Sequence, residues 1–101
     1  MGPKRYNAGM ADPDISPLRD KARAKMAGGK LPKTLQEVER IVADPRNHAN
    51  GVCAVCDAPI SKKEFWYQVD QSGITPKAIA RPMHYLCHAA WQLEVRGMPR
   101  S

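Results

Sequence analysis

Long apolar runs are absent from the 101-residue sequence, and aromatic residues make up only 6% of it. No stretch approaches the roughly 18 apolar residues that a membrane span requires. The N-terminal segment, MGPKRYNAGMADPD, also lacks the apolar core that is typical of a signal peptide. We therefore expect a small cytoplasmic protein with no membrane segment and a thin hydrophobic core, too short for a large enzyme fold.

Acidic residues are too few to balance the basic ones, because 16 Lys and Arg stand against 10 Asp and Glu, a formal net charge of +6. A positive excess of this size attracts polyanions such as nucleic acids. It also lies in the range that simply keeps a small domain soluble. Charge alone therefore leaves nucleic-acid binding and plain solubility equally open.

The first part of the chain is rich in turn signals and predicts an arm followed by a short helix. Residues 1–15 hold several Gly and Pro residues with no apolar period, which indicates a flexible basic arm. Ser16-Pro17 is typical of a helix start, and Gly28-Gly29 is typical of a helix end. We therefore expect a basic helix over residues 17–27.

A second helix is predicted over residues 34–43, completing a region of short helices at 16–46. Thr34 and Glu37 have the spacing of a capping box. The helix would carry a narrow apolar stripe, formed by Leu35, Val38, Ile41 and Val42. Because so short a helix is unstable alone, we expect the stripe to pack on an apolar face of the last helix, formed by Leu86, Ala90 and Leu93.

The second part of the chain predicts a hairpin and a terminal helix. Residues 65–69, Phe-Trp-Tyr-Gln-Val, are strong strand formers. A turn over residues 70–77 separates them from a return strand at 78–81. Pro82 is suited to begin a helix that Gly97 ends.

Four residues in this part carry metal-ligating chemistry. Cys53 and Cys56 form a C-x2-C pair, and His84 and Cys87 form an H-x2-C pair after 27 intervening residues. Zinc favours four thiolate or imidazole ligands at tetrahedral corners. A C-x2-C turn offers two of them, and an i, i+3 pair on the last helix offers the other two. Because all three cysteines are then used, the sequence predicts one structural Zn2+ bound by Cys53, Cys56, His84 and Cys87.

Two alternatives to this ligand set are weaker. A C-x-x-C pair also occurs in thioredoxin-like redox sites, but these belong to a βαβ pattern that this sequence does not have. His88 follows His84 at the spacing of two-Cys, two-His fingers, which place about a dozen residues between the second Cys and the first His. Thiolate is also the softer ligand. We therefore expect Cys87 to bind the metal and His88 to be a solvated neighbour.

Together, these motifs resemble those of a known class of zinc-binding protein. Cys53-Ala-Val-Cys56, the aromatic strand and Met83-His84-Tyr-Leu-Cys87-His88-Ala-Ala-Trp91 resemble treble-clef zinc fingers, in particular small proteobacterial proteins with an H-x2-C-H-x2-W helix. Single LIM-type zinc sites are also similar, although LIM domains carry two such sites and this chain has cysteines for one. The resemblance implies a small α+β zinc finger over residues 51–97, with a zinc knuckle, a β-hairpin and a C-terminal helix. It implies little about activity, because treble clefs serve many functions.

A catalytic role for the metal is not favoured. Four protein ligands close the coordination shell and leave no position for an activated water. A ββα-metal nuclease shares the treble-clef core, but it needs a histidine base near the hairpin and further metal ligands. The hairpin offers Asp70 but no histidine. We therefore expect a non-enzymatic protein.

Basic side chains supply candidate contacts with a partner. One set lies on the first helix and the other surrounds the hairpin near Trp66: Arg19, Lys21, Arg23 and Lys25, then Lys62, Lys63, Lys77 and Arg81. An exposed Trp66 beside such lysines suits single-stranded nucleic acid, and core packing of Trp66 is the alternative. The leading hypothesis is a small regulatory protein that associates with nucleic acid, as a monomer or weak homodimer. The alternative is a protein–protein adaptor that uses the exposed apolar and aromatic surface of the finger.

Overall fold

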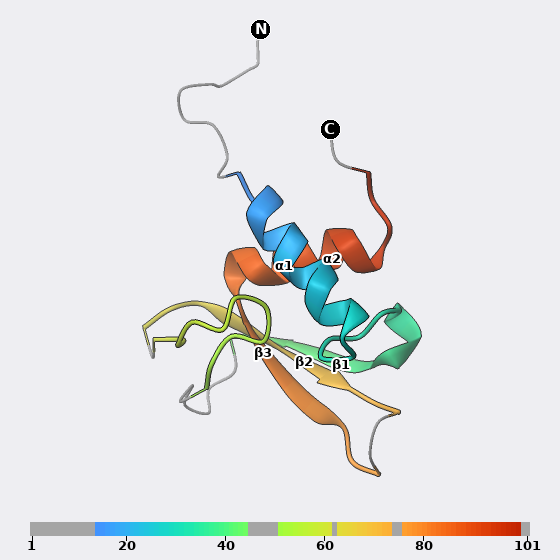
Figure 1. Ribbon diagram of the computed structural model, residues 1–101. Coiled ribbons are helices and arrows are strands. Elements are labelled where there is room, and N and C mark those ends of the chain that lie inside the picture. Colours follow the sequence, from blue (N-terminus) through green and yellow to red (C-terminus); the bar gives the residue numbers. More distant parts are fainter. Residues whose placement is uncertain (1–13, 45–50, 62, 74–75, 100–101) are drawn as a thin grey trace, which may run out of the picture.

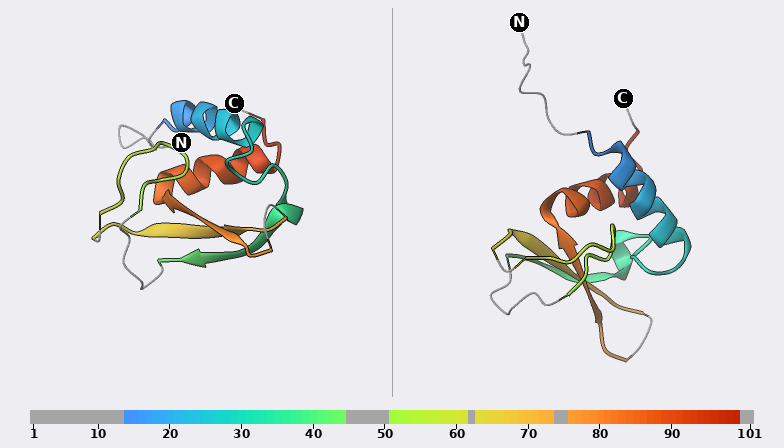
Figure 2. Two further views of the ribbon diagram at one scale, coloured as in Figure 1. Left: turned by 60° about the horizontal axis from the view of Figure 1, so that its bottom comes forward. Right: turned by 60° about the vertical axis from the view of Figure 1, so that its left-hand side comes forward.

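The computed structural model describes residues 14–44, 51–61, 63–73 and 76–99. Its elements follow in the order α1 (Ser16–Ala27), η1 (Leu35–Glu37, a single 3-10 turn), β1 (Val38–Ala43), β2 (Trp66–Gln71), β3 (Ile79–His84) and α2 (Tyr85–Val95). They form three layers, in which α2 lies between α1 and the sheet (Figure 1, Figure 2). The small α+β architecture expected from the sequence is confirmed. The expected arm lies outside the described residues apart from its last two positions.

The sheet is antiparallel, with the strand order β1-β2-β3. Strands β2 and β3 form the expected hairpin, in which Trp66 pairs with His84 and Gln71 with Ile79. The hairpin places His84 at the end of β3, directly before α2. It thereby carries one candidate ligand to the point where the last helix begins.

The predicted helix over residues 34–43 is wrong. Only a 3-10 turn forms after Thr34, whose side chain makes no capping bond to the backbone, and β1 follows as an edge strand paired with β2. The β-branched residues of this segment favour a strand. The register shifts between Val38 and Arg40, so that Glu39 is the extra residue of a β-bulge. The bulge breaks the alternation of buried and exposed positions that would have indicated a strand.

The structure also differs from the prediction at the border between the hairpin and the last helix. The return strand runs over Ile79–His84 rather than ending at residue 81, and α2 begins at Tyr85 rather than at Pro82. Pro82 fits in β3 because this strand lies at the sheet edge, where a missing N–H costs no ladder bond. Its carbonyl accepts a hydrogen bond from the Ala54 N–H at 2.7 Å. His84 is consequently the residue before α2, and Cys87 lies in the first turn of this helix.

Helix α1, rather than residues 34–43, covers α2. The basic helix predicted at 17–27 is confirmed with a start one residue earlier, and it packs across α2 (Figure 2). Ala22 of α1 and Ala90 of α2 are both fully buried. Small side chains at these positions let the two helices approach closely.

The core lies where α2, the hairpin and the loop over residues 51–60 meet. Trp91 is fully buried, and its Nε1–H donates a 3.1 Å hydrogen bond to the carbonyl of Pro32. The other core residues come from α1, the segment after it, the loop over residues 51–60, β2, β3 and α2: Ala22, Leu31, Cys53, Val55, Ile60, Trp66, Val69, Met83 and Cys87. Among the described residues, no helix is long and apolar enough to cross a membrane.

Candidate metal centre

A tight loop over residues 51–60, here called the knuckle, presents the first pair of cysteines. Val52 and Pro59 form an isolated antiparallel bridge, and the Cys53 N–H donates to the carbonyl of Ala58 at 2.8 Å. The chain turns at Asp57, whose φ is +66° and whose N–H donates to the carbonyl of Cys53. These bonds close the loop so that both thiols face the start of α2.

The four predicted ligands converge on one point. One ligand atom from each of Cys53, Cys56, His84 and Cys87 lies within 4.8 Å of all the others. Nδ1 of His84 is 3.4 Å from Sγ of Cys56 and 3.8 Å from Sγ of Cys87. In a tetrahedron with zinc bond lengths, a nitrogen and a sulfur ligand lie about 3.6 Å apart. The cluster therefore has the size and the donor set of a site for one metal ion.

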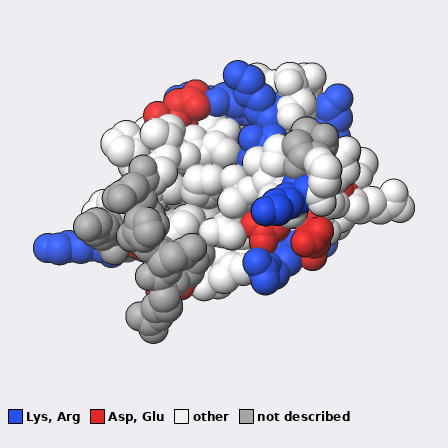
Figure 3. Space-filling model, turned by 90° about the horizontal axis from the view of Figure 1, so that it is seen from below, with Lys and Arg blue, Asp and Glu red and all other residues white. Residues whose placement is uncertain are grey.

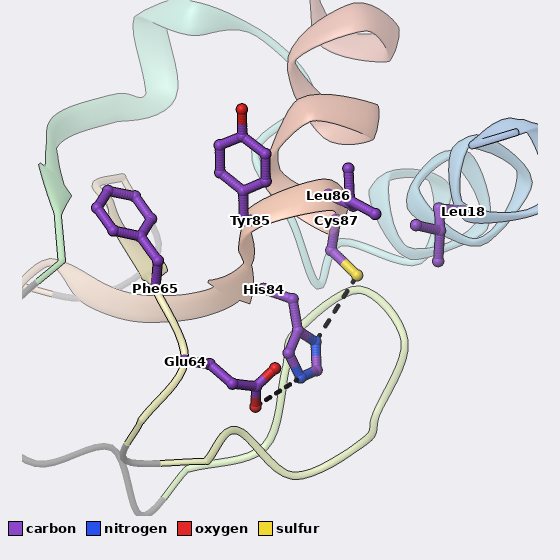
Figure 4. A pocket seen from close by; sticks show the side chains of 7 residues that line it. All are labelled: Leu18, Glu64, Phe65, His84, Tyr85, Leu86 and Cys87. Atoms are coloured by element: carbon purple, nitrogen blue, oxygen red, sulfur yellow. Dashed lines mark hydrogen bonds and ion pairs between the residues drawn. The ribbon is translucent and has the colours of Figure 1, made fainter. Parts of the chain in front are cut away.

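The imidazole of His84 is oriented for ligation by its other nitrogen. Nε2 lies 3.1 Å from the carbonyl oxygen of Pro59. It also lies 3.8 Å from Oε2 of Glu64 (Figure 4). A carbonyl oxygen only accepts hydrogen bonds, so Nε2 carries the proton. In the neutral ring the lone pair is then on Nδ1, which faces the thiols. Metal-binding histidines are commonly oriented in this way by a carbonyl or a carboxylate.

The thiols also influence each other's protonation. A hydrogen bond from Cys87 lowers the pKa of Cys53 to about 4, with smaller contributions from nearby N–H groups such as that of Val55. The same contact and burial raise the pKa of Cys87 well above its ordinary value. Without a metal, this contact thus favours the thiolate at Cys53 and the thiol at Cys87. A bound dication would stabilise the Cys87 thiolate and displace its proton.

His88 is not the solvated neighbour that the sequence suggested. Its ring stacks on Tyr67 at a centroid distance of 3.9 Å, and its Nε2 lies 3.3 Å from Nε2 of Gln92. The side chain is half-buried, and desolvation lowers its pKa. His88 therefore packs against the hairpin and lies outside the converging ligand group.

Three of the four basic residues predicted as contacts on α1 form ion pairs within the protein. Arg19 is buried, and its Nε contacts Glu94, which also binds Arg23. Lys25 pairs with Asp57 on the knuckle. Lys21 is exposed. The Arg19 guanidinium joins α1 to α2 and is not accessible to a partner.

The second set of predicted contacts is dispersed. Lys63 and Lys77 are exposed, Arg81 is half-buried, and Lys62 lies outside the described residues. Trp66 is 6% exposed and belongs to the core, so its alternative role in packing is confirmed. Seen from the sheet side, basic and acidic side chains are interspersed (Figure 3). On this face no single basic surface forms among the described residues.

Sequence reasoning missed the residues around the metal cluster. Glu64 and the Pro59 carbonyl orient His84. Neither of these groups lies at a sequence spacing from His84 that would have identified it as a partner of the histidine. An apolar groove of about 470 Å³ also borders the cluster (Figure 4). It is lined by Leu18, Glu64, Phe65, His84, Tyr85, Leu86 and Cys87.

Comparison with known proteins adds no family to this geometry. No family model matches the chain, and neither a curated protein nor a solved structure is significantly similar to it. Function must therefore be argued from the cluster and from the surface around it.

Proposed function

We propose that the protein is a treble-clef zinc finger, a non-enzymatic binding module that associates with nucleic acid. The observation that carries the first part is the convergence of three thiols and one imidazole within 4.8 Å. Soft thiolate ligands with one imidazole in a tetrahedral arrangement favour Zn2+. The order of knuckle, hairpin and helix, with ligands on the knuckle and at the start of α2, supports the treble-clef assignment.

The proposed zinc has a structural role. Four protein ligands would complete a tetrahedral shell and leave no open position for a reacting water. Asp70, the carboxylate that a nuclease hairpin would need, accepts hydrogen bonds from Arg40 and from Gln68, each at 2.9 Å. These partners hold its oxygens away from the cluster. Zinc would instead join the knuckle to the start of α2, two segments that also meet in the core.

Metal removal tests this part of the proposal. Purified protein with reduced thiols should contain one equivalent of zinc by mass spectrometry. A chelator should unfold the finger, because metal binding and folding of such a site share one free energy. Trp66 and Trp91 are both buried, so unfolding should shift their fluorescence to longer wavelengths. Much less than one equivalent, or unchanged fluorescence and circular dichroism after chelation, would contradict the structural role.

Nucleic-acid association is supported by a concentration of positive charge at the knuckle. The pKa of Asp57 is lowered by its hydrogen bond to Lys25 and by the charges of Lys25, Lys30 and Lys21. One carboxylate cannot neutralise three ammonium groups. With a net charge of +6, the chain therefore keeps a positive surface beside the finger. Such a surface attracts phosphates at long range.

Salt-dependent binding tests the association. Fluorescence anisotropy with labelled single-stranded DNA and RNA should show binding that weakens steeply as salt rises, because phosphate contacts release counterions. A slope near zero, or no binding in low salt, would contradict this part of the proposal while leaving the metal site intact.

A second candidate function, protein–protein adaptor, is favoured by the apolar groove next to the cluster. Phe65, Tyr85 and Leu86 expose 48%, 55% and 36% of their surface there. Exposed apolar surface around a pocket is typical of a protein-binding site. If this function is correct, Phe65→Ser and Leu86→Ser should both abolish capture of the same purified partner. Met98→Ser is a matched control, because Met98 is 49% exposed and does not line the groove.

A further inference from the structure

A second hollow, about 290 Å³ in volume, lies between the knuckle, the end of α1 and the edge strand β3. Lys25, Lys30 and Arg81 line it, together with Asp57 and with small or apolar residues of the knuckle and of β3. The three cations come from α1, from the turn after α1 and from β3, so only the folded chain brings them together. Two of them are among the contacts predicted from the sequence, and Lys30 is not.

Two of the cations are held in place by neighbours. The Arg81 Nε donates a 2.9 Å hydrogen bond to Oε1 of Gln71, which uses one of the five N–H donors of the guanidinium. Lys25 is fixed by its ion pair with Asp57 and retains further donors on its ammonium group. Lys30 is exposed at the rim. The hollow thus gathers three positive charges around one negative charge, and Gln71 holds the guanidinium of Arg81 in place.

We propose that this hollow binds a backbone phosphate of a nucleic-acid strand. The inference rests on the proposed nucleic-acid function and assigns a place to it. Guanidinium and ammonium donors converging from three directions suit the tetrahedral oxygens of a phosphodiester. A volume of this size accommodates the phosphate and part of the adjoining sugar, whereas a bulky apolar ligand would leave the cations unpaired.

A different role for the same cations would be to balance the thiolates. Cys53 also lines the hollow, and a Cys3His site with zinc carries a net negative charge. If the cations serve the thiolates, loss of a cation weakens metal binding. If they bind a phosphate, metal binding stays intact while nucleic-acid binding falls, so the two roles are separable.

The test compares charge-matched variants of the zinc-loaded full chain. Lys30→Gln and Arg81→Gln remove a cation from the hollow, whereas Lys33→Gln and Arg96→Gln remove the same charge from exposed positions that do not line it. Anisotropy with a labelled single-stranded DNA of about 20 nucleotides gives affinity and salt slope for each protein. Zinc content and competition with a zinc chelator are measured in parallel.

We expect each hollow variant to bind the oligonucleotide roughly tenfold more weakly and to reduce the salt slope by about one. The two control variants should lose less than about threefold through net charge alone. Zinc retention should be equal in all five proteins. If Arg81→Gln melts well below the wild type, Lys30→Gln carries the comparison, because Lys30 is exposed.

Three outcomes would overturn the inference. Equal losses in all four variants would mean that only net charge matters. Weaker zinc retention with unchanged oligonucleotide binding would assign the cations to the metal centre. Displacement of the oligonucleotide by millimolar inorganic phosphate from wild type and Lys30→Gln alike would place the phosphate contacts elsewhere. Absence of wild-type binding in low salt is a separate result, since it removes the proposed function itself before any variant is compared.

Discussion

Arg19 provides the sharpest test of how this fold is held together. The sequence places it among surface cations, whereas the structure buries it between α1 and α2, with side-chain exposures of 7% for Arg19 and 6% for Glu94. Its guanidinium also donates to the carbonyl of Met98. Arg19→Met keeps much of the aliphatic volume and removes these bonds. The largely exposed Arg23 would still pair with Glu94 in this variant.

The expected destabilisation follows from the charge left behind. Breaking a buried ion pair by removing one partner costs about 3–5 kcal/mol. Because Arg23 still compensates part of the charge on Glu94, we expect the lower end, about 3 kcal/mol. For a domain of this length, that loss lowers Tm by roughly 10–20 °C. The measurement is urea and thermal unfolding of the zinc-loaded protein, followed by circular dichroism.

A double variant separates the ion pair from simple packing. Replacing both partners with apolar residues of similar size, as in Arg19→Met with Glu94→Met, should recover most of the stability, because no uncompensated charge stays buried and Arg23 is largely exposed. The reasoning would be refuted if Arg19→Met melted like the wild type. A variant of normal stability with impaired nucleic-acid binding would restore the surface role that the sequence suggested.

Three further predictions concern the metal centre and the effect of pH. Cys87→Ser should abolish most of the zinc affinity, which competition with a chelator measures. His88→Ala should retain the metal and lower the free energy of unfolding by about 1 kcal/mol, because its stacking on Tyr67 is lost, and thermal melting measures this change. Glu64→Gln should weaken zinc binding by less than about tenfold in the same competition, because the Pro59 carbonyl still orients His84; an unchanged affinity would show that Glu64 contributes nothing. Burial raises the pKa of Glu94, but hydrogen bonds and charges from two arginines outweigh burial and hold this pKa below its ordinary value. The ionised Glu94 carboxylate therefore stabilises the fold at pH values above the ordinary pKa of a glutamate, and this stabilisation is lost as pH falls through the lowered pKa of the folded state. The urea midpoint should consequently decline less across the acid range in Glu94→Gln than in the wild type.

The metal ligands could be predicted from the sequence because ligand chemistry depends on residue type and spacing. Three cysteines and a histidine at C-x2-C and H-x2-C spacing fit few arrangements apart from a metal centre. The predicted convergence of these four residues is confirmed, although the register around them was wrong. His84 was expected inside a helix and instead ends β3, yet either geometry brings it to Cys87. The groups that orient His84 could not be found, since a carbonyl has no sequence signature.

Strand β1 could not be predicted, because its partner is distant in sequence. Val38 pairs with Gln71, and Ala43 pairs with Tyr67. Local signals such as the Thr34–Glu37 capping box compete with this pairing only weakly, since a short helix is marginal without tertiary contacts. The side chains of Thr34 and Glu37 approach only to 3.4 Å. Pairing with β2 gives one side of this segment a ladder of backbone hydrogen bonds over six residues, which a single helical turn could not do.

The predicted cover on α2 is met only in part and by a different element, because α1 packs on α2 and Ala90 is buried while Leu86 stays exposed. Helix α1 has few apolar residues, and its cations suggested a surface that faces solvent. Arginine, however, can bury its aliphatic stem while its guanidinium finds a partner. Arg19 does this through Glu94, which the sequence places on α2 and which no local pattern links to α1. Once that pair forms, Ala22 can lie against α2 without an apolar stripe of the usual width. The charge on α1 therefore serves the packing of the fold through Arg19, which pairs with α2, and through Lys25, which pairs with Asp57 on the knuckle.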